Sequence, residues 1–129
     1  MKRKWFFALL LALLLGGCNA DLRGEENAAY TFGVVLKTMD SEHWMEIRAG
    51  MENAASERGI RIVLQYPSNE LAAEEQKTIL RDMLAEPIDA LLFSPCDSGD
   101  TAWIVSEAEP HGLPLFTIDT GTLDSKLPY

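Results

Sequence analysis

Four short apolar runs divide the chain at similar intervals. They cover residues 30–36, 60–66, 89–94 and 115–118, and within each run the apolar side chains are nearly continuous. A strand that is open to water on one face would instead alternate apolar and polar residues. Continuous apolar runs of this length are typical of strands buried on both faces of a parallel sheet. The sequence therefore predicts four strands, of which the first is expected to be buried.

An amphipathic segment follows the first run. Within residues 42–58 apolar side chains recur at helical spacing, and the polar side chains lie on the opposite face. The apolar residues are Trp44, Ile47, Met51, Ala54 and Ala55. Ser41 stands where a side chain would cap the start of this helix. Gly59 suits a left-handed helix end, with Ile60 placed for the apolar contact that closes such an end. We predict a helix over residues 42–58.

Two further helices are expected between the remaining runs. One covers residues 71–85 and ends before Pro87, because the residue before a proline disfavours helical backbone. The other is shorter and runs from a cap at Asp97 or Ser98 to about Glu109. Each strand, helix, strand step takes about 30 residues, the length of a right-handed crossover. The fold class is thus α/β, a doubly wound parallel sheet with helices on both faces.

This layout predicts where a ligand binds. In an open parallel sheet the site lies beyond the carboxyl ends of the strands, where the strand order reverses. The segments that reach this edge are residues 37–44, 95–98 and 119–122, whereas the turn at residues 67–70 is expected to be peripheral.

The beginning of the chain is typical of an export signal. A basic head at residues 2–4 precedes an apolar run from Trp5 to Leu15, which is shorter than the roughly 20 residues of a spanning helix. Leu15-Gly16-Gly17-Cys18 then resembles the lipobox of bacterial lipoproteins, which implies cleavage before Cys18 and its lipidation. The alternative is ordinary signal cleavage after Ala20. We expect a signal peptide over 1–17, a polar linker over 18–29 and the folded part over 30–129.

Charge and cysteine content narrow the possible functions. Residues 1–17 carry three basic and no acidic residues, so the remainder holds 8 basic against 20 acidic residues, a formal charge of −12. Nucleic acid is therefore not expected as a partner. With Cys18 lipidated, Cys96 is the one remaining thiol and has no internal disulfide partner. The spacing between the two histidines, His43 and His111, and the cysteines matches no zinc site. We therefore expect neither a metal nor a cofactor.

The segment after the first strand favours binding of a polar small molecule. Residues 37–44 contain no glycine, so their backbone cannot wrap a pyrophosphate as nucleotide-binding loops do. They supply a hydroxyl, a carboxylate, an ammonium group and two rings, a mixture that suits a ligand with many hydroxyls. Neither a G-x-S-x-G elbow nor an H-E-x-x-H helix occurs in the sequence, so we do not expect an enzyme.

The order of several short motifs resembles one family. From Phe32 to Asp119 the chain is similar to the first half of the N-terminal lobe of type I periplasmic binding proteins, the ribose- and galactose-binding kind. The matching pieces are residues 33–38, residues 49–51, residues 94–98 and residues 112–119. The resemblance implies a solute-binding protein of an ABC sugar importer, with permease subunits as partners of the full-length form.

The resemblance also implies which residues face the ligand. They are Lys37, Ser41, His43, Trp44 and Asp119. Thr120 stands where family members often carry arginine, and His43 replaces one aromatic of the usual pair, so the ligand could be a pentose, a hexose or a furanosyl signalling compound.

Each of these residues also has a structural interpretation. Trp44 could belong to the core, Ser41 could only cap the helix, and Asp119 could be a turn residue. Lys37 and His43 could simply face solvent.

Other protein classes share parts of this pattern. A receiver-type signalling domain and a lactose-type repressor have a similar core, but an export signal disfavours the first and the absence of a basic helix-turn-helix disfavours the second. An extracytoplasmic sensor, which reports ligand occupancy to a membrane kinase, remains an alternative.

After the signal, 112 residues remain, enough for half of a two-lobed cleft. We expect either a piece of a longer protein or the product of a prematurely stopped gene, with marginal stability and little ligand affinity by itself.

Overall fold

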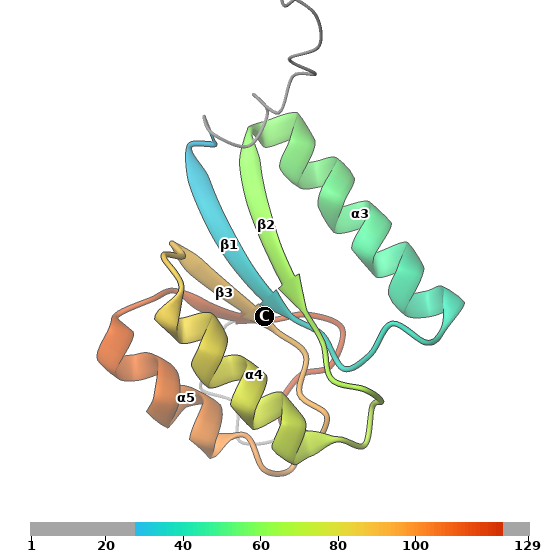
Figure 1. The fold of residues 1–129 in the computed structure, drawn as a ribbon, viewed down its shortest axis with the longest axis vertical. Helices are drawn as coiled ribbons and strands as arrows, with labels where there is room; N and C mark the ends of the chain where they lie inside the picture. The colour runs from blue at the N-terminus through green and yellow to red at the C-terminus, as the bar shows by residue number, and fades with distance from the viewer. Residues whose placement is uncertain (1–27, 123–129) are drawn as a thin grey trace, which may run out of the picture.

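The computed structural model describes residues 28–122, which form one α/β unit (Figure 1). The predicted signal peptide, Cys18 and nearly all of the linker lie outside the described residues. Within residues 28–122 no helix is long and apolar enough to cross a membrane. The elements in chain order are β1 (Tyr30–Val35), α3 (Glu42–Arg58), β2 (Ile60–Gln65), α4 (Ala73–Ala85), β3 (Ala90–Phe93), α5 (Ala102–Ala108), η1 (Glu109–His111) and β4 (Leu115–Thr117).

The four strands form one parallel sheet in the order β2-β1-β3-β4. The chain moves from β1 to β2 through α3 and then crosses back over β1 through α4 to reach β3. The strand order therefore reverses between β1 and β3, and the predicted doubly wound α/β fold class is confirmed.

Alternate residues of the strands serve two apolar layers. Val35, Leu91 and Phe93 pack against α4 and α5 on one face. Val34 and Leu36 pack against α3 on the other face. The continuous apolar runs in the sequence arise from this arrangement, because both faces of the inner strands are covered. Figure 1 shows α3 across the strands from α4 and α5.

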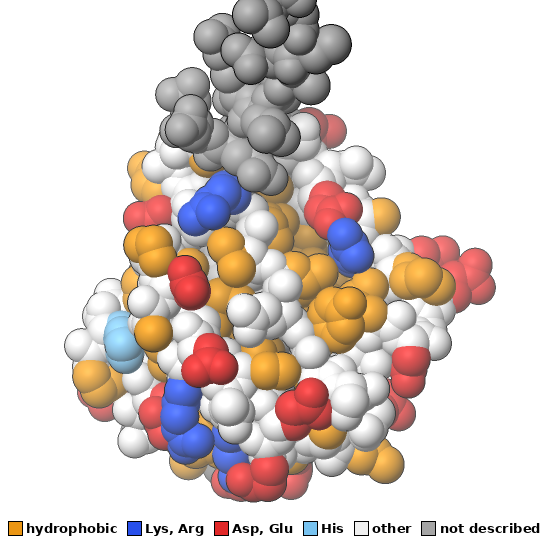
Figure 2. Space-filling view, in the orientation of Figure 1, with side chains coloured by type: hydrophobic (Ala, Val, Ile, Leu, Met, Phe, Trp, Pro, Cys, Tyr) orange, Lys and Arg blue, Asp and Glu red, His pale blue; other side chains and the backbone are white. Residues whose placement is uncertain are grey.

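Coverage of the sheet is incomplete at β2, the edge strand next to β1. Every residue of β2 is half-buried. Figure 2 shows apolar side chains on the face between α3 and α4, with charged side chains around them.

Gly33 allows α4 to approach the sheet closely. A Cβ atom at this position would lie 2.8 Å from the Ile88 Cδ1 atom and 2.8 Å from the Met83 Sδ atom. Residue 33 lies on the α4 face of β1, opposite Leu91 in β3. The hydrogen atom of glycine leaves room for these two side chains over the middle of the sheet.

The ends of α3 are partly as predicted. Gly59 has a φ of 64°, and its N–H points to the carbonyls of Ala55 and Ser56, so the left-handed ending is confirmed. Ser41 does occupy the N-cap position with extended backbone, but its hydroxyl makes no capping hydrogen bond. The prediction of a side-chain cap at Ser41 was therefore wrong. The backbone carbonyl of Ser41 instead accepts from the Met45 N–H.

Two helix starts differ from the prediction. Leu71 lies outside α4 and is 85% exposed, because a turn around Asn69 precedes the helix and the Asn69 side chain accepts from the Leu71 N–H. The third helix begins at Ala102, not at Asp97 or Ser98. Asp97 accepts from the Gly99 N–H at 2.8 Å in a local turn, and the N-cap position of α5 is occupied by Thr101.

Candidate functional site

Three loops leave the same edge of the sheet. The Ser94 N–H donates to the Val35 carbonyl at 2.9 Å, and the Ile118 N–H donates to the Phe93 carbonyl at 3.1 Å. The segments after β1, β3 and β4 therefore start side by side at the carboxyl ends of their strands. This is the edge where the strand order reverses, as the sequence predicted for the ligand site.

His43 and Asp119 meet at this edge although 76 residues separate them. The His43 Nε2 and Asp119 Oδ1 atoms are 3.0 Å apart, and since a carboxylate only accepts, the ring nitrogen is the donor. Their side chains are 59% and 32% exposed. An exposed pair of this kind contributes only about 0–1 kcal/mol to the stability of the fold. The pair is notable because it lies at the edge where the strand order reverses.

The backbone around Asp119 turns its carboxylate toward His43. Asp119 has a φ of 61°, a left-handed value that is uncommon for residues other than glycine and is tolerated best by Asp and Asn. The Thr120 hydroxyl donates to the Asp119 Oδ2 atom at 3.1 Å, so each carboxylate oxygen has one partner. Thr120, the residue that departs from the usual arginine, thus helps to orient the acid.

Trp44 lies beneath the edge and not on its surface. Its side chain is only 5% exposed and packs in the apolar layer with Val34 and Leu36. The His43 ring meets the Trp44 ring edge-on, with centroids 5.2 Å apart and planes at 73°. His43 is therefore the ring that faces solvent here, and a ligand contact by Trp44 stays a prediction.

Lys37 and Ser41 are half-buried in the segment between β1 and α3. The Lys37 carbonyl lies 4.0 Å from the Cys96 Sγ atom, so the loops after β1 and β3 touch. Burial raises the pKa of the Cys96 thiol to about 11, and the nearby Lys37 charge opposes this rise. The thiol is therefore neutral and poorly nucleophilic at neutral pH.

The sequence reasoning missed Gln76. This residue of α4 is 1% exposed and its side chain makes three hydrogen bonds to the backbone of the two loops. A signal was present, because residue 76 lies on the same helix face as Leu80, Met83 and Leu84, all buried. A polar amide on an apolar stripe has to find buried partners.

Ser94 was also missed. It directly follows β3 and is fully buried, and its hydroxyl oxygen has no hydrogen-bond partner among the described residues. Its place at the strand end gives the edge a second buried polar group beside Gln76.

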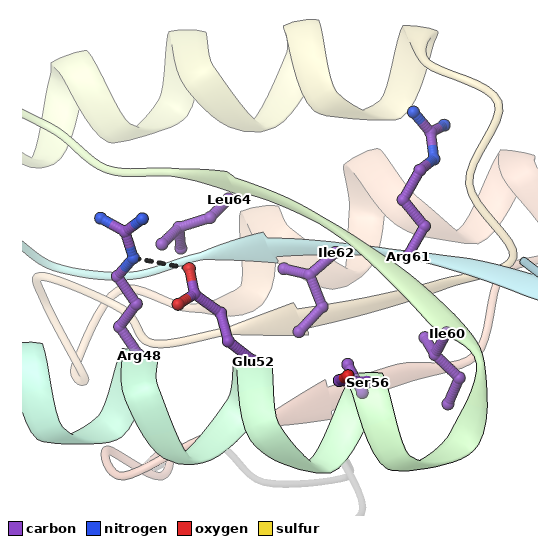
Figure 3. Close-up of a pocket in the computed structure, with 8 residues that line it drawn as sticks. Arg48, Glu52, Ser56, Ile60, Arg61, Ile62 and Leu64 are labelled. Atoms are coloured by element: carbon purple, nitrogen blue, oxygen red, sulfur yellow. Dashed lines mark hydrogen bonds and ion pairs between the residues drawn. The ribbon is translucent and has the colours of Figure 1, made fainter. Parts of the chain in front are cut away.

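Two grooves lie away from the loop edge. One, of about 490 Å³, runs between α3 and β2 and contains an Arg48–Glu52 ion pair with an Nε to Oε1 distance of 2.7 Å (Figure 3). The other, of about 260 Å³, is an apolar groove lined by Phe32, Met51, Ile62 and their neighbours. Neither groove includes His43 or Asp119. Within residues 28–122 there is also no group of three or more His, Cys, Asp or Glu residues that could hold a metal ion.

The sheet is open and parallel, and its loops converge where the strand order reverses. Open α/β sheets of this kind bind ligands at that point. The model of one family, described as a periplasmic binding protein domain, matches residues 32–128. The chain belongs to this periplasmic binding protein family, and the predicted resemblance to the type I sugar-binding kind is confirmed.

Two curated relatives are similar in sequence. The ribose import binding protein RbsB of Bacillus subtilis (strain 168) is 26% identical over 98 residues, which is 76% of this chain and 32% of the relative. The D-allose-binding periplasmic protein of Escherichia coli (strain K12) is 24% identical over 116 residues, which is 90% of this chain and 35% of the relative. The chain thus spans about a third of the length of these relatives.

Solved structures agree with this assignment. A carbohydrate transporter solute-binding protein from Agrobacterium radiobacter, in complex with D-arabinose, has a TM-score of 0.70 and 27% identity over 78% of this chain and 33% of its own. A periplasmic solute-binding protein of an ABC transporter from Actinobacillus succinogenes 130z, with bound D-allose, has a TM-score of 0.68 and 25% identity over 72% of this chain and 32% of its own.

Proposed function

We propose that the complete protein is an extracytoplasmic substrate-binding lipoprotein that captures a sugar for an ABC-type importer. Relatives that bind ribose, D-allose and D-arabinose support the class of ligand. The lipobox at Cys18 supports anchoring on the outer face of the membrane, and permease subunits would be the protein partners. The proposed ligand contacts are Lys37, Ser41, His43, Trp44 and Asp119.

The observation that carries this proposal is the carboxylate of Asp119 at the loop edge. One carboxylate accepts hydrogen bonds from two neighbouring hydroxyls, and such charge-assisted bonds are about twice as strong as neutral ones. In the structure the two oxygens are held by His43 and Thr120, both polar groups that can turn away. A sugar would take over the His43 bond, and the imidazole would then be free to bond a further ligand hydroxyl.

The remaining contacts follow from the same edge. Lys37 and Ser41 lie in the segment that joins β1 to His43 and are both half-buried, which supports their proposed place beside the ligand. Trp44 supports the His43 ring from below through their edge-on contact. The chemistry is binding without bond breaking, because none of these groups forms a nucleophile and base pair.

Sugar titrations on the complete product of the gene test the proposal. Isothermal titration calorimetry with D-ribose, D-allose and D-arabinose should reveal binding of at least one sugar. Asp119→Asn should weaken that binding by about 10- to 100-fold, the equivalent of the 1.5–3 kcal/mol of a hydrogen bond to a charged group. Asp82→Asn, the same change on the exposed face of α4, should leave it unaltered. Absence of binding to every sugar, or equal affinities for the two variants, contradicts the proposal.

A further inference from the structure

Gln76 is the one side chain of α4 that reaches both loops at the reversal point. Its Nε2 atom donates to the Leu36 carbonyl at 3.1 Å and to the Ser94 carbonyl at 2.8 Å. Its Oε1 atom accepts from the Cys96 N–H at 2.8 Å. Leu36 directly precedes Lys37, and Ser94 and Cys96 bracket the turn after β3. One buried amide therefore links the starts of the segments that border the proposed ligand.

We infer that Gln76 is a positioning residue for the ligand site. Strand pairing fixes β1 against β3 up to Val35 and Phe93, and the last backbone bonds beyond them are donated by the Leu36 and Ser94 N–H groups. The Leu36 and Ser94 carbonyls and the Cys96 N–H are held by the Gln76 amide. The amide satisfies two carbonyls and one N–H there, which would otherwise be buried without partners. It thereby sets the spacing of the two loops that a ligand has to bridge.

Only an amide side chain with the length of glutamine has the required donors and acceptor in this geometry. Two donors on one nitrogen and an acceptor on the adjacent oxygen are specific to an amide. Glutamate would place an oxygen against the Leu36 and Ser94 carbonyls, and methionine would fill the space with no hydrogen bonds. The sequence position matters as well, because Gln76 lies in the first turns of α4, which begins near the carboxyl ends of the strands.

This inference rests on the proposed function, and the test separates the two. In the complete product of the gene, Gln76→Met is compared with Ile79→Ala, which removes from the same helix a half-buried side chain that packs against the apolar core. Sugar affinity is measured by calorimetry at a temperature where all variants are folded. Hydrogen exchange of the Cys96 amide is measured by NMR without ligand.

We expect Gln76→Met to weaken sugar binding by at least about 10-fold and to lose protection of the Cys96 amide, while Ile79→Ala lowers thermal stability and changes the affinity by less than about 2-fold. Should Gln76→Met fail to fold, Gln76→Glu keeps an acceptor for the Cys96 N–H but loses both donors to the Leu36 and Ser94 carbonyls, so it should also weaken sugar binding by at least about 10-fold. Equal affinities for Gln76→Met and Ile79→Ala, or an unchanged Cys96 exchange rate, overturn the inference. A wild type that binds no sugar overturns the proposed function, and the exchange rates then decide alone whether Gln76 holds the loops.

Discussion

The close packing of α4 over Gly33 gives a prediction with an internal control. Changing Gly33 to alanine adds a methyl group 2.8 Å from the Ile88 and Met83 side chains, so these must move. Overpacking of this kind costs about 1–3 kcal/mol. The reduced entropy of the unfolded chain returns about 0.4–1 kcal/mol. We therefore expect Gly33→Ala to lower the free energy of unfolding by about 1–2 kcal/mol.

Gly50→Ala is the matched control. Gly50 lies in α3, is exposed, and a Cβ atom there would have no neighbour within 4 Å. The same chemical change should therefore raise stability, by about 0.5–1 kcal/mol, because alanine is the better helix former. The two variants differ in the expected sign, which a general effect of alanine substitution cannot produce.

Urea unfolding of the complete gene product, followed by tryptophan fluorescence, measures both effects. With a slope of about 1–3 kcal/mol per molar urea, a loss of 1–2 kcal/mol moves the midpoint down by about 0.5–1 M. Met83→Ala alone should cost about 2–5 kcal/mol, because Met83 is fully buried. In a double variant with Gly33→Ala the two losses should sum to less than their separate values, because the new methyl group occupies space that Met83 vacates. If Gly33→Ala raises the midpoint as Gly50→Ala does, α4 does not pack as the structure has it.

Two further predictions concern single residues. Gly59→Ala should lower the free energy of unfolding by about 1 kcal/mol although the space around it is open, because its φ of 64° is unfavourable for a residue with a Cβ atom; an unchanged urea midpoint would show that the α3 end relaxes without cost. Cys96 should react slowly with iodoacetamide at pH 8 in the folded protein, since a pKa of about 11 leaves about one thiol in a thousand ionised, against about one in ten at the ordinary value of 9.0. Peptide mass mapping resolves Cys96 from other thiols. Its alkylation should accelerate by about 100-fold when urea unfolds the chain, whereas equal rates in the two states would contradict the described burial.

The strands were predictable because of how they are buried. The run at residues 30–36 corresponds to the inner strand β1 at Tyr30–Val35, and the run at residues 89–94 to the inner strand β3 at Ala90–Phe93. A strand covered on both faces appears in the sequence as a continuous apolar run. The helices before and after it contain polar residues, which mark the ends of the run. Since short crossovers make the strands parallel, their carboxyl ends share one edge, and this loop edge was predictable too.

Helix starts were predicted less well, for a local reason. Asp97 and Ser41 are both residue types that favour N-caps, yet Asp97 binds the Gly99 N–H in a turn and the Ser41 hydroxyl makes no capping bond. Short polar side chains compete among several nearby backbone groups, and sequence alone does not decide between them.

The site was predictable in its location and less so in its contacts. The position of His43 and Asp119 at one edge follows from topology, but their 3.0 Å contact depends on the left-handed backbone of Asp119. The links made by Gln76 are fixed only by tertiary packing of α4 against both loops.

Chemical-shift mapping of a sugar titration tests the central claim most directly. In the complete gene product, D-ribose or D-allose is added to the 15N-labelled protein and the perturbed backbone amides are assigned. We predict that, within residues 28–122, the perturbed amides cluster in residues 37–44, 94–98 and 119–122, with His43 and Asp119 among them. Perturbations centred instead on the α3–β2 groove at Arg48 and Glu52, or none with any sugar, would contradict the account.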